Sequence, residues 1–141
     1  METVTYKTIL HTVATDGVKL LEITLQYPIF CGTDAVIVHM NEFEATYADT
    51  LAKGIVQKKQ PALAAAWQAH KAAGGRKSDF SPVRCTLTGT AMQTDGEYLW
   101  VWEYRELGGG EHRAISGVRR RDKHGNLRKN LSKTHLLPAK S

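Results

Sequence analysis

Alternating apolar and polar residues in the N-terminal part of the chain predict two paired β-strands. An Asp16-Gly17 pair separates the two runs, and such pairs tolerate the positive φ angles of a tight type I′ turn. A two-residue loop there would place Leu10 opposite Ile23 and His11 opposite Glu22. This register collects apolar side chains on one face and polar side chains on the other. The pattern therefore predicts a half-solvated antiparallel hairpin.

A second alternating segment predicts a hairpin whose large rings stand opposite small residues. Its turn is Asp95-Gly96, which would pair Gly89 with Trp102. Four aromatic residues follow one face of its second strand: Tyr98, Trp100, Trp102 and Tyr104. An exposed stripe of this kind can stack on sugar rings or on nucleic-acid bases. Core packing beneath a helix is favoured, because a covering helix needs such a surface, and an exposed binding platform is the alternative.

Between the hairpins, apolar residues recur at intervals of three and four and predict a long helix. Thr33 is the expected N-cap, with Asp34 at the positive end of the helix dipole. Pro61 suits the first turn of a helix better than its interior. We therefore expect a helix over 34–59, a kink or break, and a second helix over 61–73. The apolar stripe comprises Val36, Met40, Phe43, Tyr47, Leu51 and Ile55.

Further turn signals divide the C-terminal part into strands. Gly108-Gly109-Gly110 forms a third turn and residues 123–126 a fourth, so that a strand is expected over 111–121. The order is ββ-α(α)-βββ, and strands joined by tight turns run antiparallel. We expect one α+β domain over 1–141, in which an antiparallel sheet of about five strands packs on one long helix, straight or kinked.

Positive charge is concentrated in the C-terminal quarter of a chain whose formal net charge is +5. From His112 onward nine Lys or Arg accompany a single acid, so this segment carries +8 and the residues before it carry −3. A basic strand can track a polyanion, with binding that weakens steeply as salt is added; a solvated strand end is the alternative. The candidate binding residues are Trp100, Trp102, Tyr104, Arg113, Arg119, Arg120, Arg121, Lys123, Arg128 and Lys129.

No pattern of residues predicts a catalytic centre, a metal site or a cofactor. A Gly-x-Ser-x-Gly elbow is absent, and the glycine-rich turn lacks the lysine of a P-loop. Cys31 and Cys85 are too few for a zinc site, which leaves two free, buried thiols as the expectation. The least favoured hypothesis is a hydrolase that uses Glu103 and Glu111. Flanking arginines make cross-strand ion pairs the simpler role for these two glutamates.

The chain shows no membrane-spanning or secretory segment. Its longest apolar-rich stretches are interrupted by charged and amide side chains, short of the roughly 20 apolar residues that a membrane span needs. The start Met1-Glu2-Thr3 lacks the basic beginning and apolar middle of a signal peptide. This start predicts a cytoplasmic protein, or an extracellular one if a leader has been removed.

The C-terminal turns carry a pattern that resembles one bacterial domain family. Residues 103–112 read EYRELGGGEH and residues 121–127 read RDKHGNL. They resemble the tyrosine-rich strand, the Gly-Gly-Ala-His-Gly turn and the Asp-x-x-x-Gly-x-x-Leu turn of the extracellular domain of lysozyme-sensing anti-sigma factors, which also occurs beside the catalytic domain of some peptidoglycan deacetylases. Tyr27-Pro28 and Asn41 resemble the Tyr-Pro pair and the helical Asn of that architecture.

The resemblance implies a binding or accessory module that faces the cell wall. Gly110-Glu111 stands where the family has Ala-His, and His112 is displaced. No catalytic residue is carried over, because the known catalysis of the family resides in other domains. Our leading hypothesis is a non-enzymatic binding domain of bacterial type for a cell-wall glycan, a wall-active protein or another anionic partner. The alternative is nucleic-acid binding through residues 119–129, with the aromatic residues as a stacking surface.

Overall fold

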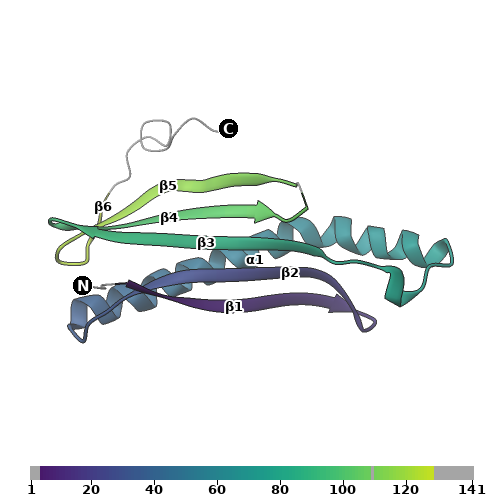
Figure 1. Cartoon of the computed structure of the whole chain (residues 1–141), viewed down its shortest axis with the longest axis horizontal. Coiled ribbons are helices and arrows are strands. Elements are labelled where there is room, and N and C mark those ends of the chain that lie inside the picture. Colours follow the sequence, from purple (N-terminus) through teal and green to yellow (C-terminus); the bar gives the residue numbers. More distant parts are fainter. Residues whose placement is uncertain (1–3, 109, 129–141) are drawn as a thin grey trace.

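A computed structural model describes residues 4–108 and 110–128, which form a six-stranded sheet with one long helix along one face (Figure 1). The sheet order follows the sequence order. The elements are β1 (Val4–Thr15), β2 (Val18–Phe30), α1 (Ala35–Ala72), the short 3-10 helix η1 (Lys77–Asp79), β3 (Val83–Thr94), β4 (Glu97–Glu106), β5 (His112–Asp122) and β6 (Leu127–Arg128). The α+β class expected from the sequence is confirmed.

The sheet is mixed, which corrects the expectation of a purely antiparallel sheet of about five strands. β2 and β3 run parallel, with Leu21 beside Val83 and Gln26 beside Thr88, whereas every other neighbouring pair is antiparallel. The connection explains the difference. α1 carries the chain back to the end of the sheet where β2 begins, and parallel strands need a crossover of this kind.

α1 is one unbroken helix, which corrects the predicted break at Pro61. This proline lies exposed inside the helix, where its ring removes one backbone hydrogen bond. Ile55 on one side of it and Trp67 on the other are both buried against the strands. Their packing holds the helix together across the missing bond, because tertiary contacts contribute more to helix stability than local propensity does.

The two ends of α1 are fixed by short-range contacts. Asp34 is the N-cap in place of the predicted Thr33, and its side chain accepts a hydrogen bond from the Val36 amide at 2.8 Å. At the other end Gly74 has a φ of 81°, the left-handed conformation that commonly terminates helices. The helix ends at Ala72, within one residue of the expected end at 73.

The first hairpin turns at Asp16-Gly17 as expected, but its pairing shifts by one residue between Val13 and Ala14. Leu20 stands outside the pairing at this bulge. It is 2% exposed and packs with Trp67, while Leu21 is fully buried in the main core. The bulge therefore lets two consecutive leucines enter two different apolar clusters, which strict alternation would not allow.

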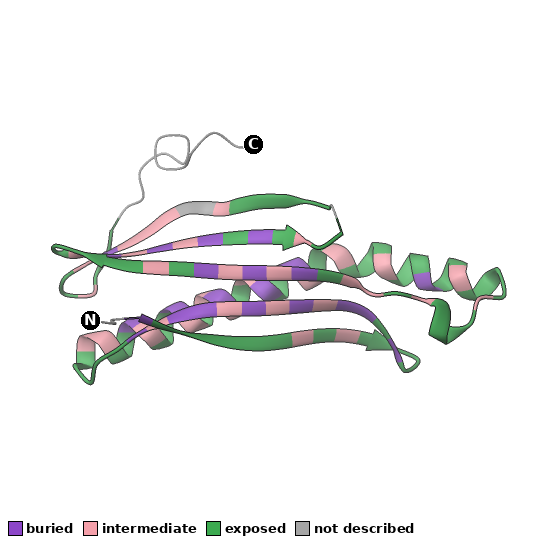
Figure 2. Ribbon diagram, in the orientation of Figure 1, coloured by how far each residue is buried: buried purple, intermediate pink, exposed green. Residues whose placement is uncertain are grey.

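The shift exchanges the faces of β1 relative to the predicted register. Leu10 lies opposite Thr24 and His11 lies opposite Ile23. His11 therefore points to the helix side, where its Nε2 is 4.0 Å from a carboxylate oxygen of Asp49. Leu10 is 57% exposed on the open face, and most of β1 is exposed in Figure 2.

The main core lies between α1 and the sheet, and the aromatic stripe of β4 forms part of it. The β3–β4 register is the predicted one, with Gly89 opposite Trp102. Trp100 and Trp102 are 0% exposed and Tyr104 is 1% exposed. Core packing of this stripe is thereby confirmed, and these rings offer no surface for stacking on a ligand.

The buried line of α1 is shifted from the predicted apolar stripe. Before Pro61 it comprises Met40, Glu44, Ala48, Ala52 and Ile55, and the alanines allow the helix to approach the aromatic rings closely. Phe43, which was expected to face the sheet, is 53% exposed, and Glu44 is 2% exposed in its place. Within the described ranges, no helix is both long and apolar enough to cross a bilayer.

Candidate functional site

A buried carboxylate of α1 is held by two arginines of β5. Alternate residues of a strand point to the same face, so Arg119 and Arg121 both reach Glu44. The Arg119 guanidinium donates from Nε to Oε1 at 2.9 Å and from Nη2 to Oε2 at 3.0 Å. Nε of Arg121 donates to Oε2 at 2.9 Å. We call these three residues the arginine clamp.

The clamp carries one positive charge in excess, because two guanidinium groups share one carboxylate. The side chains are 11% exposed for Arg119, 6% for Arg121 and 2% for Glu44. Burial lowers the pKa of Arg119, but the hydrogen bonds and the charge of Glu44 outweigh it, so the pKa lies above its usual value. Arginine side chains stay charged in proteins, and an uncompensated buried charge favours an added anion.

Two rings of α1 lie against the guanidinium groups. The Arg119 guanidinium carbon is 3.8 Å from the Tyr47 ring centroid, and that of Arg121 is 5.0 Å from the Phe43 centroid. Cation–π contacts of this kind stabilise a desolvated guanidinium and fix its orientation. The remaining N–H groups of Arg121 are thus held in place rather than free to swing into solvent.

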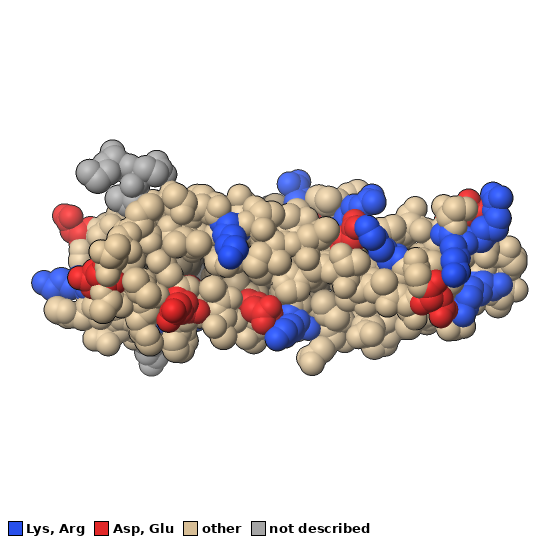
Figure 3. Space-filling view, turned by 90° about the horizontal axis from the view of Figure 1, so that it is seen from below, with Lys and Arg blue, Asp and Glu red and all other residues tan. Residues whose placement is uncertain are grey.

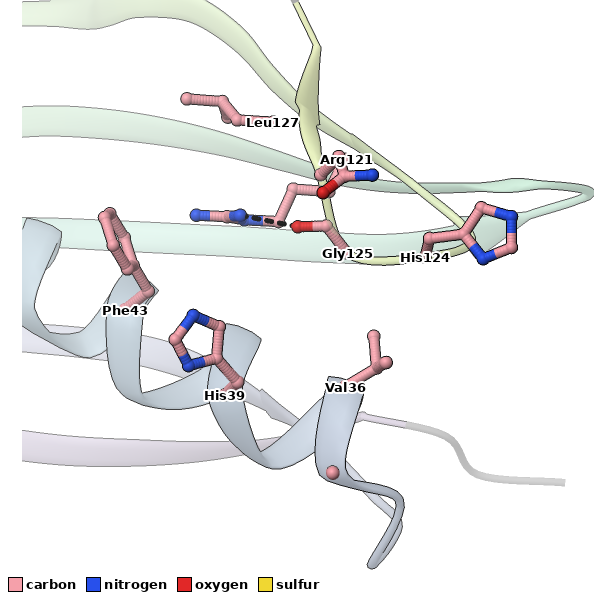
Figure 4. A pocket seen from close by; sticks show the side chains of 9 residues that line it. Val36, His39, Phe43, Arg121, His124, Gly125 and Leu127 are labelled. Atoms are coloured by element: carbon pink, nitrogen blue, oxygen red, sulfur yellow. Dashed lines mark hydrogen bonds between the residues drawn. The ribbon is translucent and has the colours of Figure 1, made fainter.

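A pocket of about 370 Å³ opens beside Arg121, between the first turns of α1 and the turn that joins β5 to β6. This volume falls in the usual range for small-ligand sites. Figure 4 shows His39 and Phe43 projecting from α1 toward Arg121 and the turn. The full lining is Ala35, Val36, His39, Phe43, Arg121, His124, Gly125, Asn126 and Leu127.

The β5–β6 turn is fixed by its own hydrogen bonds and by packing on α1. Oδ1 of Asp122 accepts from the backbone N–H groups of Asn126 at 3.0 Å and His124 at 2.9 Å, and these bonds, led by that of Asn126, lower the pKa of the Asp122 carboxyl. Gly125 has a φ of 85°, and a Cβ there would lie 2.8 Å from Val36 Cγ1.

Arg121 joins this turn to the clamp. Its Nη1 donates to the Gly125 carbonyl at 2.7 Å. An arginine side chain has five N–H groups, and its bonds to Glu44 and Gly125 use two of them. The guanidinium therefore retains the capacity to bind a carboxylate or phosphate oxygen at the pocket.

The other described basic residues that were predicted to bind a partner do not line the pocket. Nη2 of Arg120 donates to Glu97 at 2.8 Å, and Nη1 of Arg128 lies 3.9 Å from the same carboxylate. Arg113 donates to Glu111 at 2.6 Å and lies over the Tyr104 ring. Lys123 is exposed in the β5–β6 turn, and Lys129 lies outside the described residues. Much of the charge on this strand is thus neutralised by neighbouring acids.

Glu103 and Glu111, the catalytic residues of the hydrolase hypothesis, do not line the pocket. Glu103 lies 3.8 Å from His112, and Glu111 is paired with Arg113. The expected ion pair of Glu111 with an arginine is present, whereas the partner of Glu103 is a histidine. Nothing in this arrangement presents two carboxylates across a cavity.

A polar chain that is buried at Cys85 and Tyr104 runs from β3 across β4 to α1. The Cys85 thiol lies 3.3 Å from the Tyr104 hydroxyl, which donates to Glu106 at 3.0 Å, and Lys59 donates to the same carboxylate. Burial raises the pKa of the Cys85 thiol and of the Tyr104 hydroxyl. A buried thiol with a raised pKa is a poor nucleophile, so this chain is structural. Both cysteines are free as expected, although Cys31 is exposed rather than buried.

Sequence reasoning missed the residues that shape the pocket. Glu44 stands four residues after Met40 and four before Ala48, so a carboxylate on the buried line was the available signal. Phe43 was assigned to the apolar stripe of the helix, and neither His39 nor His124 belongs to a recognisable motif. Across the part of the chain that the structure describes, no group of three or more His, Cys, Asp or Glu side chains is placed to hold a metal ion.

The helical asparagine of the family resemblance has a clear structural role. Asn41 accepts from the Phe30 amide at 3.0 Å and donates to the Phe30 carbonyl at 2.9 Å. The side chain thereby ties the first turns of α1 to the end of β2. The chain matches no protein-family model and no curated protein, so the resemblance to the lysozyme-sensing and deacetylase-associated domains stays a prediction.

Proposed function

We propose that this chain is a non-enzymatic binding domain that recognises an anionic partner at the pocket beside Arg121. The observation that carries the proposal is the charge balance of the arginine clamp, in which two buried guanidinium groups share the single carboxylate of Glu44. A carboxylate entering the pocket would compensate the excess charge through charge-assisted hydrogen bonds, the strongest kind that proteins form.

The lining supports a carboxylate-bearing sugar as the ligand. Phe43 is 53% exposed and lies 6.1 Å from His39, centroid to centroid. Two adjacent rings beside a guanidinium suit a sugar ring that stacks while its acid group pairs with Arg121. Leu127, 51% exposed, adds an apolar wall. Cell-wall glycan fragments carry this combination of sugar ring and carboxylate, and they agree with what the family resemblance implies.

Nucleic-acid binding is a weaker candidate. A protein that tracks a phosphate backbone presents several free basic side chains, whereas Arg113, Arg119, Arg120 and Arg121 are each bonded to an acid. A gel-shift assay with single-stranded and double-stranded probes at two salt concentrations separates the two hypotheses. A shift at low salt that disappears at higher salt would favour nucleic acid.

The test is calorimetric titration with soluble peptidoglycan fragments and, in a second arm, with lysozyme. Fragment binding should weaken by roughly three- to tenfold in Phe43→Ala, which removes the stacking ring at an exposed position. Val38→Ala is the matched control, because Val38 is 43% exposed on the same helix and does not line the pocket. Binding of lysozyme alone would point to a wall-active protein as the partner. The absence of binding to both the fragments and lysozyme would refute the wall-related function.

A further inference from the structure

β1 is the edge strand of the sheet, and one of its two sides is free. It pairs with β2 along Val4–Thr15, and within residues 4–108 and 110–128 no strand pairs with its other side. Figure 1 shows it along the lower border of the sheet. A long free edge presents a row of unpaired backbone N–H and C=O groups, which is a template for another strand.

β1 has few of the features that usually protect an edge strand. It contains no proline, and the bulge in its pairing with β2 lies in β2, where Leu20 is left out opposite the step from Val13 to Ala14. Lys7 and His11 are its only basic residues, and it has no acid. Figure 3, which views the molecule from below, shows charged side chains of both signs scattered over the middle of this face and no large single-sign patch there. Within the strand, Lys7 and His11 are therefore the residues that limit pairing, and they do so by disfavouring particular registers.

The exposed apolar side chains of the chain are concentrated on this strand. Tyr6 is 44% exposed, Ile9 36% and Leu10 57%. These are three of the eight large hydrophobic residues exposed in the described part of the chain, although β1 is a short stretch of it. Apolar residues gathered on a free edge are typical of a surface that another chain covers.

We propose that β1 pairs antiparallel with β1 of a second copy, joining two sheets across a two-fold axis at Leu10. A second copy of the chain suits the free edge of β1, because an antiparallel pairing of identical strands is self-complementary. The open face of β1 offers Thr and apolar residues without any charge, so the two copies meet there without repulsion. This surface is separate from the pocket, which lies at the β5–β6 turn.

Charge and apolar contacts select the register. A pairing centred on Ile9 would place Lys7 opposite His11 of the other copy, and basic side chains directly opposite each other are unfavourable. A pairing centred on Leu10 separates them, so that Ile9 faces His11 and the two Leu10 side chains face each other. The second register therefore fits the strand better.

The size of the contact predicts a weak dimer. In the Leu10-centred register about 11 residues pair, a strip of about 37 Å by 10 Å, or roughly 370 Å² for each copy. A standard stable interface covers about 800 Å² on each partner. We therefore expect a concentration-dependent dimer with a dissociation constant in the micromolar range or weaker.

Sedimentation velocity of the whole chain between about 1 μM and 1 mM covers the range expected for an interface of this size. We expect a reversible monomer–dimer equilibrium that Leu10→Lys weakens at least about tenfold, since it sets two cations opposite each other. Met92→Lys is the matched control, because Met92 is 56% exposed at the end of β3. A monomer over the whole range, or a Leu10→Lys protein that dimerises like the parent, would overturn the proposal.

Disulfide trapping tests the register without depending on affinity. In a Cys31→Ser background, which removes the exposed thiol, Leu10→Cys should form a disulfide-linked dimer on mild oxidation. Residues directly opposite in an antiparallel pair are about 4.5–5.5 Å apart at Cα, within the range that a disulfide spans. Ile9→Cys should link far less, because its two copies would be diagonal neighbours about 7–8 Å apart. Efficient linkage of Ile9→Cys and none of Leu10→Cys would contradict the proposed pairing.

Discussion

Glu44 of α1 and Arg119 of β5 form a bidentate ion pair, with both carboxylate oxygens accepting from one guanidinium at 2.9 and 3.0 Å. The two residues are 75 positions apart in the chain. The pair therefore couples the helix to the fifth strand, and the pocket beside Arg121 depends on that coupling for its shape.

Glu44→Gln should destabilise the protein strongly. The substitution leaves two buried guanidinium groups without a counter-charge, and breaking a buried ion pair in this way costs about 3–5 kcal/mol. Urea unfolding monitored by circular dichroism measures the change. Glu97→Gln is the matched control, since its pairing with Arg120 is 23% exposed on the acid side, and the expected loss is below about 1 kcal/mol. Equal losses in the two variants would contradict a special role for Glu44.

Gly89→Ala and Gly54→Ala should change stability in opposite directions. A Cβ at Gly89 would lie 2.5 Å from the Trp102 ring, and overpacking of this kind costs about 1–3 kcal/mol. A Cβ at Gly54 meets nothing within 4 Å on α1, where alanine stabilises a helix by about 1 kcal/mol relative to glycine. Thermal unfolding of both variants checks the prediction. A stabilised Gly89→Ala protein would show that the Trp102 ring does not lie over this glycine.

Pro61→Ala should stabilise the protein by about 1–2 kcal/mol. The substitution restores a backbone N–H inside a continuous helix, although the greater freedom of the unfolded chain offsets part of the gain. Ala62→Pro, one position further along the same exposed stretch, is the opposing variant and should destabilise by about 3 kcal/mol. Chemical denaturation compares the three proteins. A loss of stability in Pro61→Ala would indicate that the helix is broken there after all.

Acid should weaken the contact between α1 and β4 through Glu106. Its hydrogen bond from Lys59 lowers the pKa of this carboxyl below its ordinary value of 4.5. A carboxyl with a lowered folded-state pKa contributes stability that is complete above its unfolded pKa and is lost as pH falls through the folded value. Glu106→Gln should cost about 1 kcal/mol at neutral pH and progressively less below about pH 4.5. Urea unfolding across this interval checks it, and a pH-independent difference would contradict it.

The parts of the fold that local contacts determine could be predicted from the sequence. Asp95-Gly96 fixes the β3–β4 register, and the ring of Trp102 over Gly89 requires no information from elsewhere in the chain. The turn at Asp16-Gly17 could be predicted in the same way. The bulge at Leu20 could not be predicted, because it depends on Trp67, a residue of the helix that packs against the hairpin.

The pocket could not be predicted for a similar reason. Its charge depends on Glu44 meeting Arg119 and Arg121 across most of the chain, and neither partner signals the other in the sequence. The parallel pairing of β2 with β3 follows from the return path of α1. Tight turns between consecutive strands give no information about this pairing. The basic strand could be recognised from its composition, and the pairing of Glu111 with an arginine was expected, but the neutralisation of the strand by Glu44 and Glu97 was not.

The excess charge of the arginine clamp should bind an acid group at the pocket. An NMR titration with a carboxylate-bearing muramyl sugar and, in parallel, with its neutral methyl ester measures this binding. The acid should shift the Arg121 Nε–H resonance and the backbone amides of His39 and Phe43 in a saturable manner, and the ester should leave Arg121 almost unchanged. Equal shifts with both sugars, or none with either, would contradict the claim.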